Sequence, residues 1–184
     1  GLPSEHANYQ GYFDNQDHGC ALWMLNEHYL YTRDRTWLSS QAKALVKACD
    51  FITRQRLAKG VHGTAAKDKH WGMGLLPPGR IDGHTDWAWW YAVNAWAWRG
   101  IRATADNLAT IGHPETERIA ANARDFGQVL RASCRESMIR APVVRLEDGT
   151  YIPLQPERSR TRGREANGFG PTALGSLALL ECGV

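Results

Sequence analysis

Apolar residues recur at every third or fourth position through most of the chain, and this spacing predicts amphipathic helices. The clearest example spans residues 35–57, where one face carries Leu38, Ala42, Leu45, Cys49 and Ile52. The same spacing predicts helices at about 17–31 and 86–111, another that begins just after residue 114, and a last one from about 170 to the end of the sequence. The pattern therefore predicts an all-α fold.

Three of the other helices also show an apolar face, which we expect to be buried. These faces consist of Ala21, Leu22, Leu25 and Tyr29 in the first helix, of Trp87, Tyr91, Asn94, Trp98, Ile101, Ala105 and Leu108 in the third, and of Ile119, Ala123, Phe126, Leu130 and Cys134 in the fourth.

Residues suited to helix ends stand between these patterns. We expect Asp34 to cap the second helix and Thr85 to cap the third, with Asp86 in its first turn, where a negative charge suits the helix dipole. Gly112 suits the end of the third helix, and Pro114 suits the first turn of the fourth. Extended patterns at 143–146 and 150–153 flank a tight turn and predict a small β-hairpin within a long loop.

The connections between the predicted helices alternate in length. The first and second helices are joined by a few residues, as are the third and fourth, and such short links produce antiparallel helical hairpins. The remaining connections are much longer. If the hairpins stack side by side, the long connections gather at one end. We therefore expect residues 1–16, 58–85 and 141–169 to converge there, in loops of a length that is usually functional.

The second long connection carries the most informative stretch of the sequence. It is rich in Gly and Pro and places Asp82 and Asp86 two residues either side of His84, just before a run of aromatic residues that comprises Trp87, Trp89, Trp90 and Tyr91. Carboxyl groups can protonate a glycosidic oxygen or activate water, and aromatic rings can pack against a sugar. The stretch therefore indicates carbohydrate chemistry. The alternative is a plain connector followed by a buried helix whose tryptophans belong to the core.

The three long segments share this character, because each combines aromatic, acidic and hydrogen-bonding side chains. The first carries Tyr9, Tyr12, Phe13, Asp14, Asp17 and His18; the second adds His62, His70, Trp71 and Arg80; the third carries Glu147, Asp148, Tyr151, Glu157, Arg164, Glu165 and Asn167. Loops are polar in any protein, but their aromatic content exceeds that of a merely solvated surface.

Composition and charge narrow the possible classes. The 184 residues are 43% hydrophobic and 22% charged, which suits one core, and the formal net charge is +3. The basic run at 158–164 lacks interleaved aromatic residues, so we expect a solvated loop and no nucleic-acid partner. No apolar run approaches the length of a membrane span. The sequence begins without Met and stops inside an apolar pattern, so we expect residues 1–184 to be one segment of a longer domain.

The cysteines and histidines give no sign of a metal or a cofactor. Cys20, Cys49, Cys134 and Cys182 have no zinc spacing and are expected to be buried free thiols, which slightly favours a reducing, cytoplasmic setting. The histidines His18, His62, His70 and His84 could ligate zinc, but no pair follows the spacing of a zinc helix. A Ser-His-Asp hydrolase is not expected either, since the sequence lacks a nucleophile-elbow motif.

Several motifs together resemble the six-hairpin glycosidases. They are Gly74-Leu-Leu-Pro-Pro-Gly-Arg-Ile-Asp-Gly-His-Thr-Asp-Trp87, the leader Phe13-Asp-Asn-Gln-Asp-His-Gly19 with the helix that follows it, and Thr32-Arg-Asp-Arg-Thr-Trp-Leu38. The resemblance covers most of residues 9–140. It implies that the hairpins form part of an (α/α)6 toroid of the trehalase-like and glucosidase-like kind. A full toroid has about twelve helices, whereas this chain supplies about five.

The resemblance also implies roles for individual residues. In such enzymes a carboxylic acid in a loop that leads into a helix is the general acid, which here points to Asp82 first and to Asp86 second. Arg80, His84 and Trp87 would orient sugar hydroxyls or stack on the ring, with Trp71, Tyr12, Asp17 and His18 as further substrate contacts. A second carboxylate activates water in the inverting members, and its position in this chain is open.

The sequence thus predicts a segment of a glycoside hydrolase that acts on an oligosaccharide or glycoside by carboxylate acid/base catalysis. Two alternatives stay open at this point. One is a non-catalytic carbohydrate-binding or scaffolding module of the same helical build, and the other is a toroid lyase or epimerase. The sugar, the linkage, the stereochemical outcome and the oligomeric state are also open.

Overall fold

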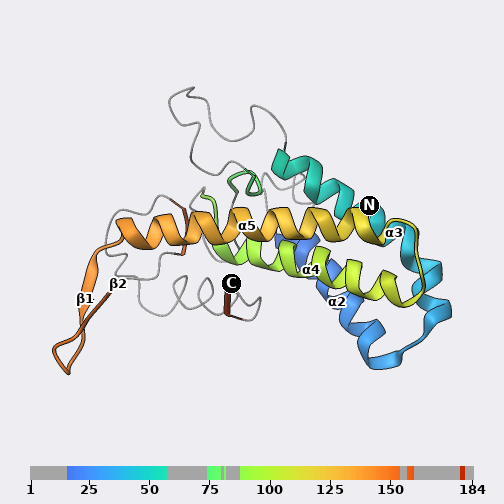
Figure 1. Cartoon of the computed structure of the whole chain (residues 1–184), viewed down its shortest axis with the longest axis horizontal. Coiled ribbons are helices and arrows are strands. Elements are labelled where there is room, and N and C mark those ends of the chain that lie inside the picture. The colour runs from blue at the N-terminus through green and yellow to red at the C-terminus, as the bar shows by residue number, and fades with distance from the viewer. Residues whose placement is uncertain are drawn as a thin grey trace.

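The structure is a computed structural model that describes residues 16–57, 74–79, 81, 88–153, 157–159 and 179–180. It contains the helices α2 (Gln16–Thr32), α3 (Arg35–Leu57), α4 (Tyr91–Thr110) and α5 (Thr116–Arg140), and the strands β1 (Val143–Arg145) and β2 (Tyr151–Pro153). The two strands pair antiparallel. The fold is all-α with a small β-hairpin, as the sequence predicts. The hairpin extends beyond the end of α5 (Figure 1).

The helices form two hairpins, α2–α3 and α4–α5, which stack side by side (Figure 1). In this stack α2 runs parallel to α4, because Gly19 lies against Ala97 near the start of both helices and the Tyr29 hydroxyl lies 2.7 Å from Thr110 Oγ1 near their ends. Arg35 also donates a hydrogen bond to the Thr110 carbonyl. Both short links therefore lie at one end, the short-link end, and the longer connections leave from the other, the long-loop end.

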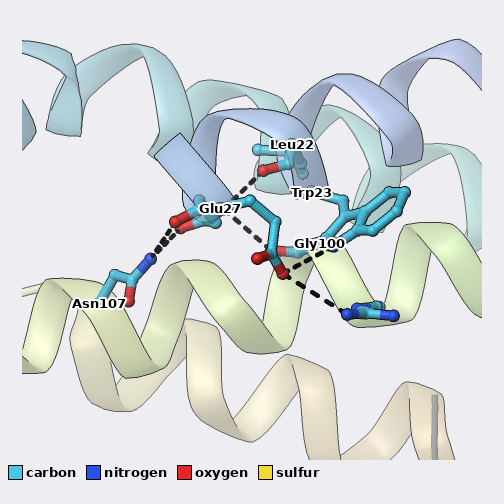
Figure 2. A network of polar contacts seen from close by, with 7 residues as sticks. Leu22, Trp23, Glu27, Gly100 and Asn107 are labelled. Carbon is cyan, nitrogen blue, oxygen red and sulfur yellow. Dashed lines mark hydrogen bonds and ion pairs between the residues drawn. The ribbon is translucent and has the colours of Figure 1, made fainter. Parts of the chain in front are cut away.

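Helix α4 is the centre of the molecule, since α2, α3 and α5 all pack against it. Gly100 allows α2 to approach closely, because a Cβ there would lie 2.7 Å from the Cβ of Leu22. A buried polar network joins the same two helices (Figure 2). Asn26 donates to Thr104 Oγ1 at 2.8 Å, and Asn107 donates to the side-chain oxygen of Asn26 at 2.8 Å. Each buried amide is thus hydrogen-bonded, which fixes the register of α2 on α4.

Most of the predicted apolar faces are confirmed. All five residues of the α3 face are buried, as are all five of the α5 face and the described residues of the α4 face. One prediction for α2 is wrong: Leu25 is 36% exposed, and Asn26 is buried in its place. Asn26 lies four residues after Leu22 and three before Tyr29, so it falls on the same face of the helix. Its amide donates hydrogen bonds to the Leu22 carbonyl and to Thr104 of α4.

Two predicted helix ends are confirmed at the short-link end. Asp34 Oδ1 accepts the backbone N–H of Trp37 at 2.9 Å, which is the expected N-cap of α3. Gly112 has a φ of +66°, the left-handed conformation that ends many helices, and His113 N bonds back to Leu108 O. Pro114 lies in the turn before α5 instead of in its first helical turn, because α5 begins at Thr116.

The start of α4 differs from the prediction. The helix begins at Tyr91, and residues 88–90 are extended, with Trp90 at φ −74° and ψ 128°. Thr85 is therefore not its cap, and Asp86 is not in its first turn. The physical reason is that residues 88–90 satisfy their backbone groups by pairing with two other segments, which a local pattern cannot reveal.

Candidate functional site

Three segments of the chain meet at the long-loop end, and residues 88–91 lie between the other two. We call this meeting point the junction. On one side, Ala88 and Gly79 exchange two backbone hydrogen bonds, each 3.0 Å long. On the other side, Ser159 N donates to Trp89 O at 3.0 Å, and Tyr91 N donates to Glu157 O at 2.8 Å. Two long connections thus meet at the first residues of α4. This confirms the predicted convergence for residues 74–79 and 157–159 of the two connections.

The bridge between Gly79 and Ala88 has a direct consequence for the candidate carboxylates. These two residues bound the segment 80–87, which contains Asp82 and Asp86. Because the bridge consists of two reciprocal hydrogen bonds, it holds both ends of that segment together beside α4. Ile81, just inside the bridge, is buried.

Trp90 anchors this junction by packing. Its side chain is 4% exposed, and its indole N–H donates to the Gly79 carbonyl at 3.0 Å. The guanidinium of Arg158 lies over the Trp90 ring, 5.2 Å from its centre. Trp90 is therefore a core tryptophan, which agrees with the alternative interpretation of the aromatic run. Arg158 belongs to the basic run, whose residues 160–164 lie outside the described part of the chain.

Asn94 ties the second connection to α4. Its buried side chain accepts the backbone N–H of Leu76 at 2.8 Å and donates to the Trp90 carbonyl at 2.7 Å. Leu76 lies in non-helical backbone, where no neighbouring turn supplies a hydrogen bond to its N–H, whereas the Trp90 carbonyl also accepts the Asn94 N–H at 3.3 Å. The Asn94 side chain thus gives the Leu76 N–H the partner that a regular helix would provide, and it holds Leu76 against the first turn of α4.

Arg56 ties the same connection to α3 and α5. The side chain is 1% exposed, donates to the Gly74 carbonyl at 3.0 Å, and forms an ion pair with Asp125 of α5. Its guanidinium also lies 4.8 Å from the centre of the Phe126 ring. A buried cation needs such partners, because transfer of an unpaired charge from water is very costly. Arg56 therefore fixes the position of Gly74, from which the second connection continues toward α4.

Tyr91 joins the first turn of α4 to the last turns of α5. Its buried hydroxyl donates to the Ser133 carbonyl at 2.8 Å and lies 2.6 Å from the Ser137 hydroxyl oxygen. Burial raises the pKa of the Tyr91 phenol, and the hydrogen bonds from the serines oppose that rise in pKa without cancelling it. The phenol thus stays protonated and serves as a fixed donor at this end.

Glu157 is the carboxylate that the structure adds to the candidate site. It is 4% exposed, and its backbone oxygen accepts the N–H of Tyr91, so the residue lies at the N-terminus of α4. A helix N-terminus favours negative charge. The sequence placed Glu157 only among the polar residues of the third connection, and nothing in its neighbours indicated that it would be buried.

Two of the predicted substrate contacts lie in the described part of the chain. Asp17 is half-buried in the first turn of α2, at the long-loop end. His18 is buried, and its ring stacks on Phe51 of α3 with 4.3 Å between ring centres. That position suits contact between two helices, and a role for His18 in ligand binding stays a prediction. The other predicted site residues lie outside the described residues; they are Tyr12, Trp71, Arg80, Asp82, His84, Asp86 and Trp87.

The expected burial of the described cysteines holds for two of the three, since Cys20 is half-buried. Burial raises the pKa of Cys20 to about 11 and that of Cys49 to about 12, so both are protonated and unreactive near neutral pH. Cys134 is also buried. Among the residues that the structure describes, no group of His, Cys, Asp and Glu side chains has the arrangement of a metal site. Within the same residues, no helix combines the length and apolar character of a membrane span.

Comparison of the chain with protein-family models, with curated proteins and with solved structures found no match.

Proposed function

We propose that this chain is part of a glycoside hydrolase built from stacked helical hairpins, as in an (α/α)6 toroid. Its substrate is an oligosaccharide or glycoside, bound at the long-loop end. The observation that supports this most is the bridge between Gly79 and Ala88, which holds the ends of the acidic segment 80–87 at the start of α4. The parallel arrangement of α2 and α4 is also what a ring of hairpins requires.

In this proposal Asp82 is the general acid that protonates the glycosidic oxygen, with Asp86 as the second choice. Glu157 is the candidate for the second carboxylate, because it comes later in the chain and is buried at the same end. Two carboxyl groups in different surroundings can divide the acid and base roles between them, as glycoside hydrolysis requires. Arg80, His84 and Trp87 orient the sugar.

The test is hydrolysis by the intact protein, measured as new reducing ends from a panel of oligosaccharides and aryl glycosides. Asp82→Asn should lower kcat/KM about 10²- to 10⁴-fold, the usual contribution of a general acid. Glu157→Gln should lower kcat and remove one limb of the pH–rate profile. The matched control is Asp50→Asn, which alters a partly exposed carboxylate on α3 that pairs with Arg118 and should leave the rate unchanged.

Full activity in both Asp82→Asn and Asp86→Asn contradicts this proposal. An ultraviolet-absorbing unsaturated product in place of a reducing end assigns a lyase instead. Saturable sugar binding without turnover, unchanged across the pH range in which carboxylates titrate, assigns the non-catalytic binding module.

A further inference from the structure

A small hollow of about 250 Å³ lies between α4 and α5, on a part of α4 that comes well after the residues of the long-loop end. Its lining includes three alanines, Trp98, and the charged residues Arg102, Asp106, Arg124 and Arg131. The proposed hydrolase does not use this surface. Its lining is unusual because three of its eight residues are arginines and only one is acidic.

The apolar wall of the hollow is fixed in place. Trp98 is 5% exposed, and its indole N–H donates to the Ala123 carbonyl of α5 at 2.8 Å. The guanidinium of Arg102 lies over this ring, 5.5 Å from its centre. Because the ring cannot turn without breaking its hydrogen bond, it provides a rigid surface on which Arg102 is held toward the hollow.

Among the residues that the structure describes, the positive charge in the hollow is balanced only in part. Arg102 has Asp106 at 3.9 Å, a pair that is exposed and one helical turn apart, which makes it weak. Arg124 and Arg131 have no acidic partner among the residues that the structure describes. By contrast, the other arginines of α5 at its two ends, Arg118 and Arg140, each pair with a carboxylate within 2.7 Å. Two arginines thus line a concave surface whose one carboxylate, Asp106, is paired with the third arginine.

We propose that this hollow binds a small ligand that carries a phosphate group. Guanidinium groups match the oxygens of phosphate with two parallel hydrogen bonds, which an ammonium cannot do. The volume is below that of pockets for drug-sized ligands, so it suits a ligand the size of pyrophosphate or of a phosphorylated monosaccharide. Binding here is separate from hydrolysis at the long-loop end.

The test is calorimetric titration of the intact protein with pyrophosphate and with glucose 6-phosphate at constant ionic strength. We expect saturable binding of at least one probe, weakened tenfold or more by Arg124→Gln and by Arg131→Gln. The matched control is Arg135→Gln, which removes the same charge from an exposed position of α5 outside the hollow. Circular dichroism confirms that each variant is folded.

Tighter binding of glucose 6-phosphate assigns the phosphorylated sugar, and tighter binding of pyrophosphate assigns the free anion. The proposal is overturned if neither probe binds, if Arg135→Gln weakens binding as much as Arg131→Gln, or if citrate binds as tightly as either probe. Binding unchanged in Asp82→Asn is the expected result. This site and the proposed hydrolase can therefore fail independently.

Discussion

The two ends of the helical hairpins are held by different kinds of contact. At the short-link end, turns close within a few residues, through the Asp34 cap and the left-handed Gly112. At the long-loop end, buried side chains join segments that are far apart in the sequence, as Arg56 and Asn94 do. The turns at the first end close by local chemistry, beside the long-range hydrogen bonds of Tyr29 and Arg35 to Thr110, whereas the approach of the connections at the second end depends on tertiary contacts alone. The candidate site lies at the second.

The difference indicates that contacts at the long-loop end can be lost while the hairpins stay intact. The bonds that close the turns at the short-link end involve neighbouring residues, and each contributes little on its own. The bonds at the long-loop end replace backbone hydrogen bonds that residues 74–79 and 88–90 cannot make within a helix. Loss of one of them should therefore release a connection and leave the helices paired.

Asn94→Ala should have the largest effect on stability. It leaves the Leu76 N–H buried without its partner, at about 1–3 kcal/mol, and removes one of the two hydrogen bonds to the Trp90 carbonyl, at about 0.5–1.5 kcal/mol, so we expect the free energy of unfolding to fall by about 3 kcal/mol. Urea denaturation measures this. The control is Asn122→Ala on α5, a half-buried asparagine that should change stability by less than about 0.5 kcal/mol. Equal losses in both variants would show that the hydrogen bonds of the Asn94 side chain add nothing specific to stability.

Arg56→Met should come next, with a loss of about 2 kcal/mol. The variant keeps the apolar stem but loses the hydrogen bond to Gly74 and the ion pair with Asp125, whose carboxylate is 59% exposed and can be solvated. Hydrogen exchange should speed up at Leu75 and Leu76 and stay unchanged at residues 33–37. Faster exchange at both ends would show that Arg56 supports the whole fold and not one connection.

Asp34→Ala tests the short-link end and should cost about 1 kcal/mol, the usual value of an N-cap. Asp34→Ser should recover most of that loss, because its hydroxyl can accept the same N–H of Trp37. Thermal denaturation of both variants provides the measurement. Neither change should alter hydrolysis, and a loss of activity in Asp34→Ala would contradict the separation of the two ends.

The smallest effect at neutral pH concerns the buried thiols. The pKa of Cys49 is about 12 in the folded chain against an ordinary 9.0, so its contribution to stability is complete below about pH 9 and is lost as the pH rises toward 12. Stability should thus fall at alkaline pH, by up to about 1.4 kcal/mol per pH unit for each such thiol. Denaturation between pH 8 and 10.5 should show a shallower fall in Cys49→Ala, and identical slopes would refute this assignment.

Sequence patterns predicted the parts of the fold that depend on neighbouring residues. The faces of α3 and α5, the Asp34 cap and the β-hairpin all rest on spacings of a few positions. The start of α4 was missed because Ala88, Trp89 and Trp90 continue an apolar pattern that suits a helix. Their extended backbone instead depends on Gly79 and on residues 157–159, which a local pattern does not contain.

The sequence predicted the location of the candidate site better than the burial and contacts of its residues. The alternation of short and long links indicated which end would collect the loops, given that neighbouring hairpins stack in parallel, as α2 and α4 do. The burial of Glu157 and Arg56 could not be predicted, since each is charged and its partners belong to distant segments. The roles of Asp82 and Asp86 stay predictions that rest on their spacing and on the resemblance.

The most direct test of the central claim is a hydrogen-exchange footprint of the intact protein with and without the best-bound oligosaccharide. The account predicts that the sugar slows exchange at Gly79, at residues 88–91 and at 157–159, and that it leaves the links at 33–34 and 111–115 unchanged. Protection confined to the short-link end, or to the hollow between α4 and α5, would contradict a sugar site at the long-loop end.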